Sequence, residues 1–269
     1  MERMICGNIN SYQGFLAGPA YEGFEKLGIR YIELPAAIGM SLVVPELMES
    51  SDVSRMMSNL QRRNLTPITV MVYADLNREF HVPLVKRRLD FAQEIGAKYI
   101  ITDATRTPLD DRGLKRLYNT IRHLGDYAGN RDVTICLDVH GGLTSSGARC
   151  LTVMEAVNHP NVRINYDTAN IIYHNEEPID IVEDLKVIVA YVAHMHLKDT
   201  SGGYHQWSFP ALGDGAINFP GVFQVLDQAG FQGPLSLEIE GIREQDYNRA
   251  QNFEQLKRSL DYLKRIAVI

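Results

Sequence analysis

Three short apolar stretches in the second half of the chain end in side chains that commonly bind metals, and they recur at equal intervals. Their last residues, Asp138, Asp167 and His196, are spaced 29 positions apart, and a fourth stretch of the same kind ends 42 positions later at Glu238. Short apolar runs of this length are typical of buried strands. Because a spacing of about thirty residues matches one strand–helix–strand unit, the pattern predicts parallel strands that alternate with helices.

The same alternation extends over the whole chain. Apolar stretches predict strands at 4–9, 29–34, 68–73, 99–103 and 133–138, and three more that begin at 162, 192 and 235. Amphipathic patterns and glycine stops predict helices near 21–27, 45–63, 82–92, 110–127, 148–158, 178–187, 218–230 and 253–266. Eight such units in 269 residues predict one α/β domain spanning 1–269, a (β/α)₈ TIM barrel, a fold that typically has about 250 residues.

Composition and charge exclude several other classes of protein. The chain is 45% hydrophobic and 22% charged, and its net charge is −6 without an extended basic run. A nucleic-acid partner is therefore not expected, because its phosphate backbone requires a positive face. The three cysteines lack metal-type spacing, and no signal-like or membrane-spanning apolar run is present. We expect a cytoplasmic protein with a small-molecule partner and no membrane partner, while the possibility of a homo-oligomer stays open.

The predicted barrel would bring the four strand-end residues to one point. Because the C-terminal ends of parallel barrel strands meet at one face, Asp138, Asp167, His196 and Glu238 are expected to surround a single position. Three carboxylates and one imidazole suit a divalent ion of intermediate hardness. Mn²⁺ is the first choice, with Mg²⁺, Co²⁺ and Zn²⁺ as alternatives. For each residue taken singly, the alternative is a solvated acid or a helix cap.

Five motifs in the same region resemble those of a known family. They are Leu-Asp-Val-His-Gly-Gly, Tyr-Asp-Thr-Ala-Asn, His-Met-His-Leu-Lys-Asp, Leu-Gly-Asp-Gly-Ala-Ile-Asn and Leu-Glu-Ile-Glu-Gly. The chain resembles the xylose isomerase-like TIM barrel superfamily, which contains sugar phosphate isomerases and epimerases and, more distantly, AP endonucleases of family 2. The resemblance implies a metal held by Asp138, Asp167, His196 and Glu238, the residues that the spacing also selects. One departure is Asp138, where the family usually has glutamate; the shorter side chain can still reach a metal, but its reach to a substrate carbon is in question.

The catalytic candidates are Glu238, Asp138 and His140. His140 lies two positions beyond Asp138 and therefore on the same side of an extended strand. It is expected to act as a general acid or base or to bind a substrate hydroxyl, and the alternative is a packed histidine that supports a ligand. The family pattern favours His196 as the ligand of its His-x-His motif, which leaves His194 in a supporting position.

Four further residues are expected to contact the substrate. Lys198 can stabilise negative charge on a substrate oxygen, and the alternative is an ion pair with Asp199. Asn170 stands where some relatives have a histidine and is expected to hydrogen-bond the substrate or a ligand. Glu33 and Arg106 follow the second and fourth predicted strands, so both face the pocket unless they are solvated loop residues.

These residues support several hypotheses about function. The first is a metal-dependent isomerase or epimerase of a ketose, inosose or related polyol ketone, in which Glu238 and either Asp138 or His140 remove and return a proton through an enediolate. The second is a lyase or dehydratase on the same site, in which the enolate expels a β-hydroxyl with help from His140 or Lys198. A nuclease similar to the AP endonucleases is disfavoured, because those enzymes use a multi-zinc cluster with additional histidines. A sugar-binding barrel without catalysis is a further alternative.

Overall fold

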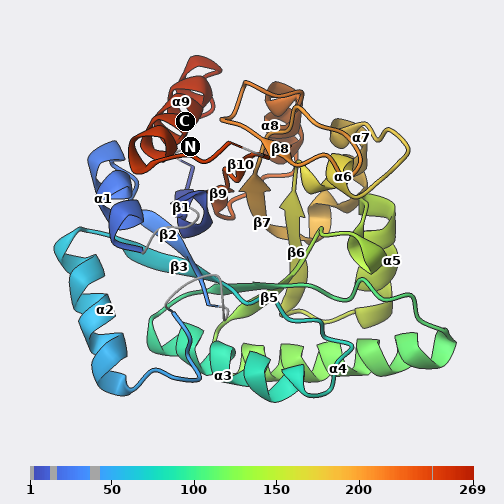
Figure 1. The fold of residues 1–269 in the computed structure, drawn as a ribbon. Coiled ribbons are helices and arrows are strands. Elements are labelled where there is room, and N and C mark those ends of the chain that lie inside the picture. The colour runs from blue at the N-terminus through green and yellow to red at the C-terminus, as the bar shows by residue number, and fades with distance from the viewer. Residues whose placement is uncertain (1–2, 13–16, 37–42, 244) are drawn as a thin grey trace.

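Eight parallel strands form a closed barrel in the computed structural model, which describes residues 3–12, 17–36, 43–243 and 245–269 (Figure 1). Each barrel strand pairs with the next one in the chain, and the last pairs with the first. The barrel strands are β1 (Ile5–Asn8), β2 (Tyr31–Pro35), β3 (Thr66–Met71), β4 (Tyr99–Thr102), β5 (Thr134–Asp138), β6 (Val162–Asp167), β7 (Val192–Leu197) and β9 (Leu235–Leu237). The predicted TIM barrel is confirmed.

Helices follow the strands and surround the barrel (Figure 1). They are α1 (Ala17–Leu27), α2 (Ser50–Arg62), α3 (His81–Glu94), α4 (Asp111–Gly129), α5 (Gly147–Val157), α6 (Asn170–Tyr173), α7 (Ile181–Ile188), α8 (Phe219–Gln228) and α9 (Arg249–Arg265). Within the described part of the chain, none of them combines the length and apolar character needed to cross a membrane.

Two of the predicted helices begin later than expected for reasons of local capping. The helix expected from 45 begins at Ser50, because Glu49 and Asp52 form a capping box that fixes its first turn. The helix expected from 178 begins at Ile181, because the side chain of Asp180 accepts hydrogen bonds from two backbone N–H groups of the first turn. In both cases a side-chain hydrogen bond decides the start, and the apolar pattern alone does not contain that information.

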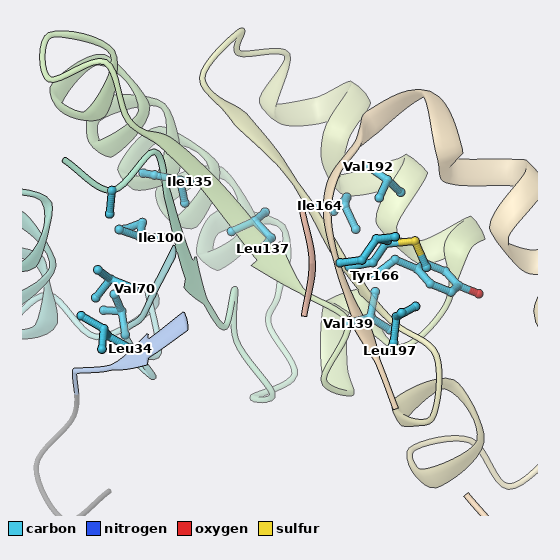
Figure 2. Packing of buried hydrophobic residues seen from close by; sticks show 14 of the residues in the cluster. Leu34, Val70, Ile100, Ile135, Leu137, Val139, Ile164, Tyr166, Val192 and Leu197 are labelled. Carbon is cyan, nitrogen blue, oxygen red and sulfur yellow. The ribbon is translucent and has the colours of Figure 1, made fainter. Parts of the chain in front are cut away.

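Alternation along the strands separates the core from the interior of the barrel. Ile135 and Leu137 of β5 are fully buried, and they belong to the same apolar cluster as Ile164 and Tyr166 of β6 (Figure 2). This cluster also contains the buried faces of the surrounding helices. Because successive side chains of a strand point to opposite faces, the residues between and after them point into the barrel. The predicted metal ligands occupy those inward positions.

A small antiparallel sheet outside the barrel was not predicted. It pairs β8 (Ser208–Phe209) with β10 (Gly241–Ile242), with Phe209 opposite Gly241. Gly241 has a φ of +75°, in the left-handed region that favours glycine. Strands of two residues are too short to show an alternating pattern, so the sequence carries no periodic signal for them.

The loop between β7 and α8 is organised by the buried carboxylate of Asp199. Its Oδ1 accepts hydrogen bonds from the backbone N–H groups of Thr200 at 2.9 Å and Ile217 at 3.1 Å. Its Oδ2 accepts from Gly213 at 2.8 Å and Gly215 at 3.0 Å. Burial raises the pKa of Asp199, although these four hydrogen bonds oppose the shift. One side chain thus fixes both ends of the loop that carries β8.

Replacing Asp199 by alanine is expected to lower the free energy of unfolding by about 2 kcal/mol or more, because buried N–H groups lose their acceptor. Urea unfolding measures the loss, and the fluorescence of Trp207, the single tryptophan of the sequence, reports on the loop itself. The matched control is Asp214→Ala, on the same loop, which removes a partly exposed partner of Arg258. That control is expected to cost no more than about 0.5 kcal/mol. Similar losses for both variants would contradict the organising role of Asp199.

Candidate metal and substrate site

Three of the four predicted metal ligands come together at the C-terminal end of the barrel. Asp167 ends β6, His196 lies at the penultimate position of β7, and Glu238 directly follows β9. Their ligand-capable atoms all lie within 4.8 Å of one another. His196 Nδ1 is 3.2 Å from Glu238 Oε2 and 3.6 Å from Asp167 Oδ2. All three side chains are buried.

The Asp167 carboxylate has one oxygen bound to the backbone and one without a donor. Its Oδ1 accepts hydrogen bonds from the N–H groups of Ala169 at 2.9 Å and Asn170 at 3.0 Å. Its Oδ2 is buried and has no hydrogen-bond partner among the residues that the structure describes. It faces His196 Nδ1 at 3.6 Å and Lys198 Nζ at 3.8 Å. A buried oxygen of this kind, beside a second carboxylate and an imidazole, fits a divalent cation of the predicted type.

Glu33 was predicted from the sequence to contact the substrate. It is buried inside the barrel beside His194 and His196 and is not part of the cavity wall. Its Oε1 is 2.9 Å from His196 Nε2 and accepts a hydrogen bond from Asn8 at 3.0 Å. Its Oε2 accepts from Ser236 at 2.7 Å and lies 3.2 Å from His194 Nε2. Burial alone would raise the pKa of Glu33, but His196 and His194 lower it to about 2. A carboxylate that accepts from Nε2–H directs the Nδ1 lone pair of His196 toward the other two ligands.

The fourth predicted ligand, Asp138, stands in a second cluster at the end of β5. Its ligand-capable atoms group with those of Asp103 and His140. His140 Nδ1 is 3.1 Å from Asp103 Oδ1 and 3.4 Å from Asp138 Oδ2. Arg106 Nη2 lies 3.0 Å from both ring nitrogens of His140. Burial would lower the pKa of His140, but its hydrogen bonds with Asp103 and Asp138 raise it to about 10, so the imidazole is protonated at neutral pH.

Lys198 forms ion pairs with Glu238 and Glu240, which follow β9. The alternative ion pair with Asp199, which the sequence left open, is not formed. Its Nζ is 3.4 Å from Glu238 Oε2 and also contacts Glu240 Oε2. The ammonium lies 4.4 Å from the ring centre of Phe209. Burial would lower the pKa of Lys198, but the carboxylates around it, Glu238 first, raise it. Lys198 is therefore a fixed cation at the site.

A cavity of about 240 Å³ joins the two clusters. Of the predicted site residues, its wall contains Arg106, Asp138, His140, Asn170, Lys198 and Glu238. Its other wall residues, which sequence reasoning missed, are Tyr73, Tyr173, Trp207, Phe209 and Glu240. Larger hollows of about 400 and 460 Å³ are both lined by Arg3, Ala267 and Val268, and neither contains any predicted site residue.

Glu240 carried a sequence signal that could have identified it. It lies two positions after Glu238, and residues two apart in an extended segment share a face. Asn10 donates a hydrogen bond to its Oε1 at 3.0 Å, and burial raises the pKa of Glu240. Trp207 and Phe209 had no comparable signal, because they come from the long loop and from β8.

A model of the family described as xylose isomerase-like TIM barrel matches residues 24–266. The chain belongs to this family.

Similar proteins include an inosose dehydratase of Clostridium botulinum, which is 25% identical over 81% of this chain and 82% of that protein. A ketose 3-epimerase of Arthrobacter globiformis is 24% identical over 80% of this chain and 78% of that protein. Among solved structures, the IOLI protein with a bound zinc atom superposes with a TM-score of 0.81 at 18% identity, over 99% of this chain and 100% of that one. A D-allulose 3-epimerase from Methylomonas sp. has a TM-score of 0.78 at 19% identity, over 98% of each chain. The predicted resemblance is confirmed, and these sequence relatives are enzymes of sugars and inososes.

Proposed function

We propose that the protein is a divalent-metal-dependent dehydratase of a keto-polyol, with an inosose as the first substrate to test. The observation that carries the proposal is the presence in one cavity wall of a carboxylate, Glu238, and of an imidazole that lies between two further carboxylates, His140. They come from β9 and β5, which are separated by two strands of the barrel. A base and an acid on different sides of one small cavity suit removal of a proton and a hydroxyl from neighbouring carbons.

The metal would be held by Asp167, His196 and Glu238, and it would act as a Lewis acid toward the ketone oxygen of the substrate. Burial would raise the pKa of Glu238, but Lys198 and His196 lower it, so its carboxylate is ionised and can accept the C–H proton next to the ketone. The Lys198 ammonium stabilises the negative charge that develops on the substrate oxygen.

Loss of water completes the reaction. As the C–O bond at the neighbouring carbon breaks, His140 donates its proton to the leaving hydroxyl, and a carbon–carbon double bond forms. The substrate gives one proton to Glu238 and loses one hydroxide, which leaves as water together with the proton from His140, so that Glu238 is protonated and His140 is neutral. Exchange of protons with solvent restores both groups.

We place the dehydratase before the epimerase because of the surroundings of Asp138. Asp138 Oδ1 accepts a hydrogen bond from Asn165 at 2.6 Å and Oδ2 faces His140 at 3.4 Å, so both oxygens already have partners. His140 is then the reacting group that this wall offers, and a proton donor at this place suits the departure of a hydroxyl. The inosose dehydratases among the relatives support the same order.

Epimerisation of a ketose is the second candidate. The ketose 3-epimerase relative favours it, and so does the position of His140, because a proton donor opposite Glu238 can also return a proton to carbon. The two reactions begin with the same C–H abstraction and differ in whether the hydroxyl leaves.

The proposal predicts that an inosose incubated with the Mn²⁺-loaded protein gives an unsaturated ketone that absorbs in the ultraviolet. Chelation should abolish the product and added Mn²⁺ should restore it, with Co²⁺, Zn²⁺ and Mg²⁺ tested in parallel. In D₂O, an epimerase would instead incorporate deuterium into a ketose without an absorbing product. Neither product nor exchange across inososes and ketoses would contradict both candidates, and cleavage of abasic duplex DNA in the same preparation would favour the nuclease hypothesis.

The proposal also includes the identity of the ion and the location of the protein. Mn²⁺ remains the first choice of ion, because two carboxylates and one imidazole combine hard and intermediate ligands. A cytoplasmic location accords with the three cysteines, Cys6, Cys136 and Cys150, which are buried free thiols.

A further inference from the structure

We infer that Asp138 is a positioning residue for His140 and does not ligate the metal, so that this chain binds the ion through Asp167, His196 and Glu238 alone. The inference rests on the proposed function, because it presupposes a divalent ion at those three residues. It departs from the four-ligand arrangement that the family resemblance implies for this position.

The distances within the two clusters carry the inference. Protein ligands to one ion lie about 2.0–2.3 Å from it, so their atoms cannot be much more than 4.6 Å apart. His196 meets this limit with both other ligands, since its Nδ1 lies 3.2 Å from Glu238 Oε2 and 3.6 Å from Asp167 Oδ2. Among the described residues, Asp138 groups with Asp103 and His140 and not with those three.

Asn165 separates Asp138 from the metal ligands. Its Nδ2 donates to Asp138 Oδ1 at 2.6 Å and lies 3.1 Å from His196 Nδ1, so an amide stands between the carboxylate and the imidazole. The other oxygen of Asp138 is turned toward His140 at 3.4 Å. The amide of Asn165 is also held at its oxygen, because His194 Nδ1 lies 2.7 Å from Asn165 Oδ1. Both oxygens of Asp138 are therefore already engaged within the described structure.

The aspartate side chain at position 138 is short, and β5 ends at this residue. At this length the carboxylate reaches Asn165 and His140, which lie beside it. Arg106 supplies the positive charge of the outer cluster, since its Nη2 contacts both His140 and Asp103 at 3.0 Å, so a second ion is not needed to balance these carboxylates.

A metal held by three protein ligands in place of four has a further position for the substrate. A catalytic metal site keeps coordination positions open for substrate, and removal of one carboxylate from the set opens another. A keto-polyol offers a carbonyl and a neighbouring hydroxyl that can occupy two positions together. The protein then retains Asp138 for a different task, which is to hold the His140 imidazole toward the cavity together with Asp103.

The test compares Mn²⁺ affinity, measured by calorimetry on the purified protein, with turnover of the substrate. We expect Asp167→Asn to weaken Mn²⁺ binding by at least about tenfold. We expect Asp138→Asn to leave the Kd nearly unchanged while kcat falls, and the matched control Asp103→Asn, which removes a carboxylate from the same cluster, to behave like Asp138→Asn. The ¹⁵N signals of the His140 ring should shift in both cluster variants and stay in place in Asp167→Asn.

A lengthened side chain provides a second, independent measurement. Asp138→Glu gives the carboxylate the reach of a fourth ligand, so we expect tighter Mn²⁺ binding and slower turnover, because His140 loses its partner. Loss of Mn²⁺ affinity in Asp138→Asn as large as that in Asp167→Asn would overturn the inference and leave the proposed function intact. Absence of Mn²⁺ binding, and of binding of the other three ions, to the unmodified protein would contradict the proposed function itself.

Discussion

Replacing Glu238 by glutamine is expected to lower kcat by about 10³-fold or more. Loss of a general base alone costs roughly 10²–10⁴-fold, and Glu238 also belongs to the group of three residues that fit a metal. The amide cannot accept the C–H proton, while its size and its hydrogen bond from Asn8 at 3.2 Å can be kept. Turnover measured at saturating Mn²⁺, with Mn²⁺ affinity measured separately, distinguishes the two contributions.

Glu240→Gln is the matched control, because both glutamates contact Lys198 and both line the cavity. It removes an equal charge from the same face of the chain, two positions away, without removing a ligand or the proposed base. We expect a clearly smaller loss of turnover and continued exchange of the substrate C–H proton in D₂O. Exchange that persists in Glu238→Gln and disappears in Glu240→Gln would assign the base to Glu240.

The fold was predictable because strand and helix periods alternate over the whole chain. The equal spacing of Asp138, Asp167 and His196 predicted repeated parallel strands, and eight strand–helix units predicted a closed barrel. Short-range capping decided what the pattern missed, as at Asp180, where a side chain starts a helix three residues later than expected. The β8–β10 sheet was unpredictable, since two-residue strands have no period.

The site was predictable as a set of residues but not as a set of contacts. Inward-facing positions at strand ends brought Asp167, His196 and Glu238 together, as the spacing required. The contacts of Asp138 and His140 depend on Asn165, in the middle of β6, and on Asp103, which follows β4. Such cross-strand contacts are set by the register of neighbouring strands, and a single sequence does not contain that register.

The position of Glu33 leads to the second large effect, which concerns stability. Glu33→Ala removes a buried carboxylate that contacts two histidines, a serine and an asparagine inside the barrel. Breaking a buried ionic cluster by removing one partner typically costs about 3–5 kcal/mol, because the remaining groups stay buried and unpaired. Urea unfolding of the metal-free protein, followed by circular dichroism, should show a loss of this size. The control is Glu183→Ala on α7, whose side chain is 67% exposed and pairs with Lys186, and it should change stability by no more than about 0.5 kcal/mol.

Glu33→Gln separates support of the metal ligand from support of the fold. The amide keeps the size of the side chain and one oxygen, so part of the network around Ser236 and Asn8 can form and the loss of stability should be smaller than in Glu33→Ala. The negative charge that holds His196 Nε2–H is lost, however, and removal of such a partner typically weakens metal binding by about 10–100-fold. Calorimetry with Mn²⁺ should therefore show a marked loss of affinity in a variant that still unfolds cooperatively. Unchanged affinity would mean that the orientation of His196 is set by Asn165, 3.1 Å from its Nδ1, and that Glu33 serves the packing of the barrel interior alone.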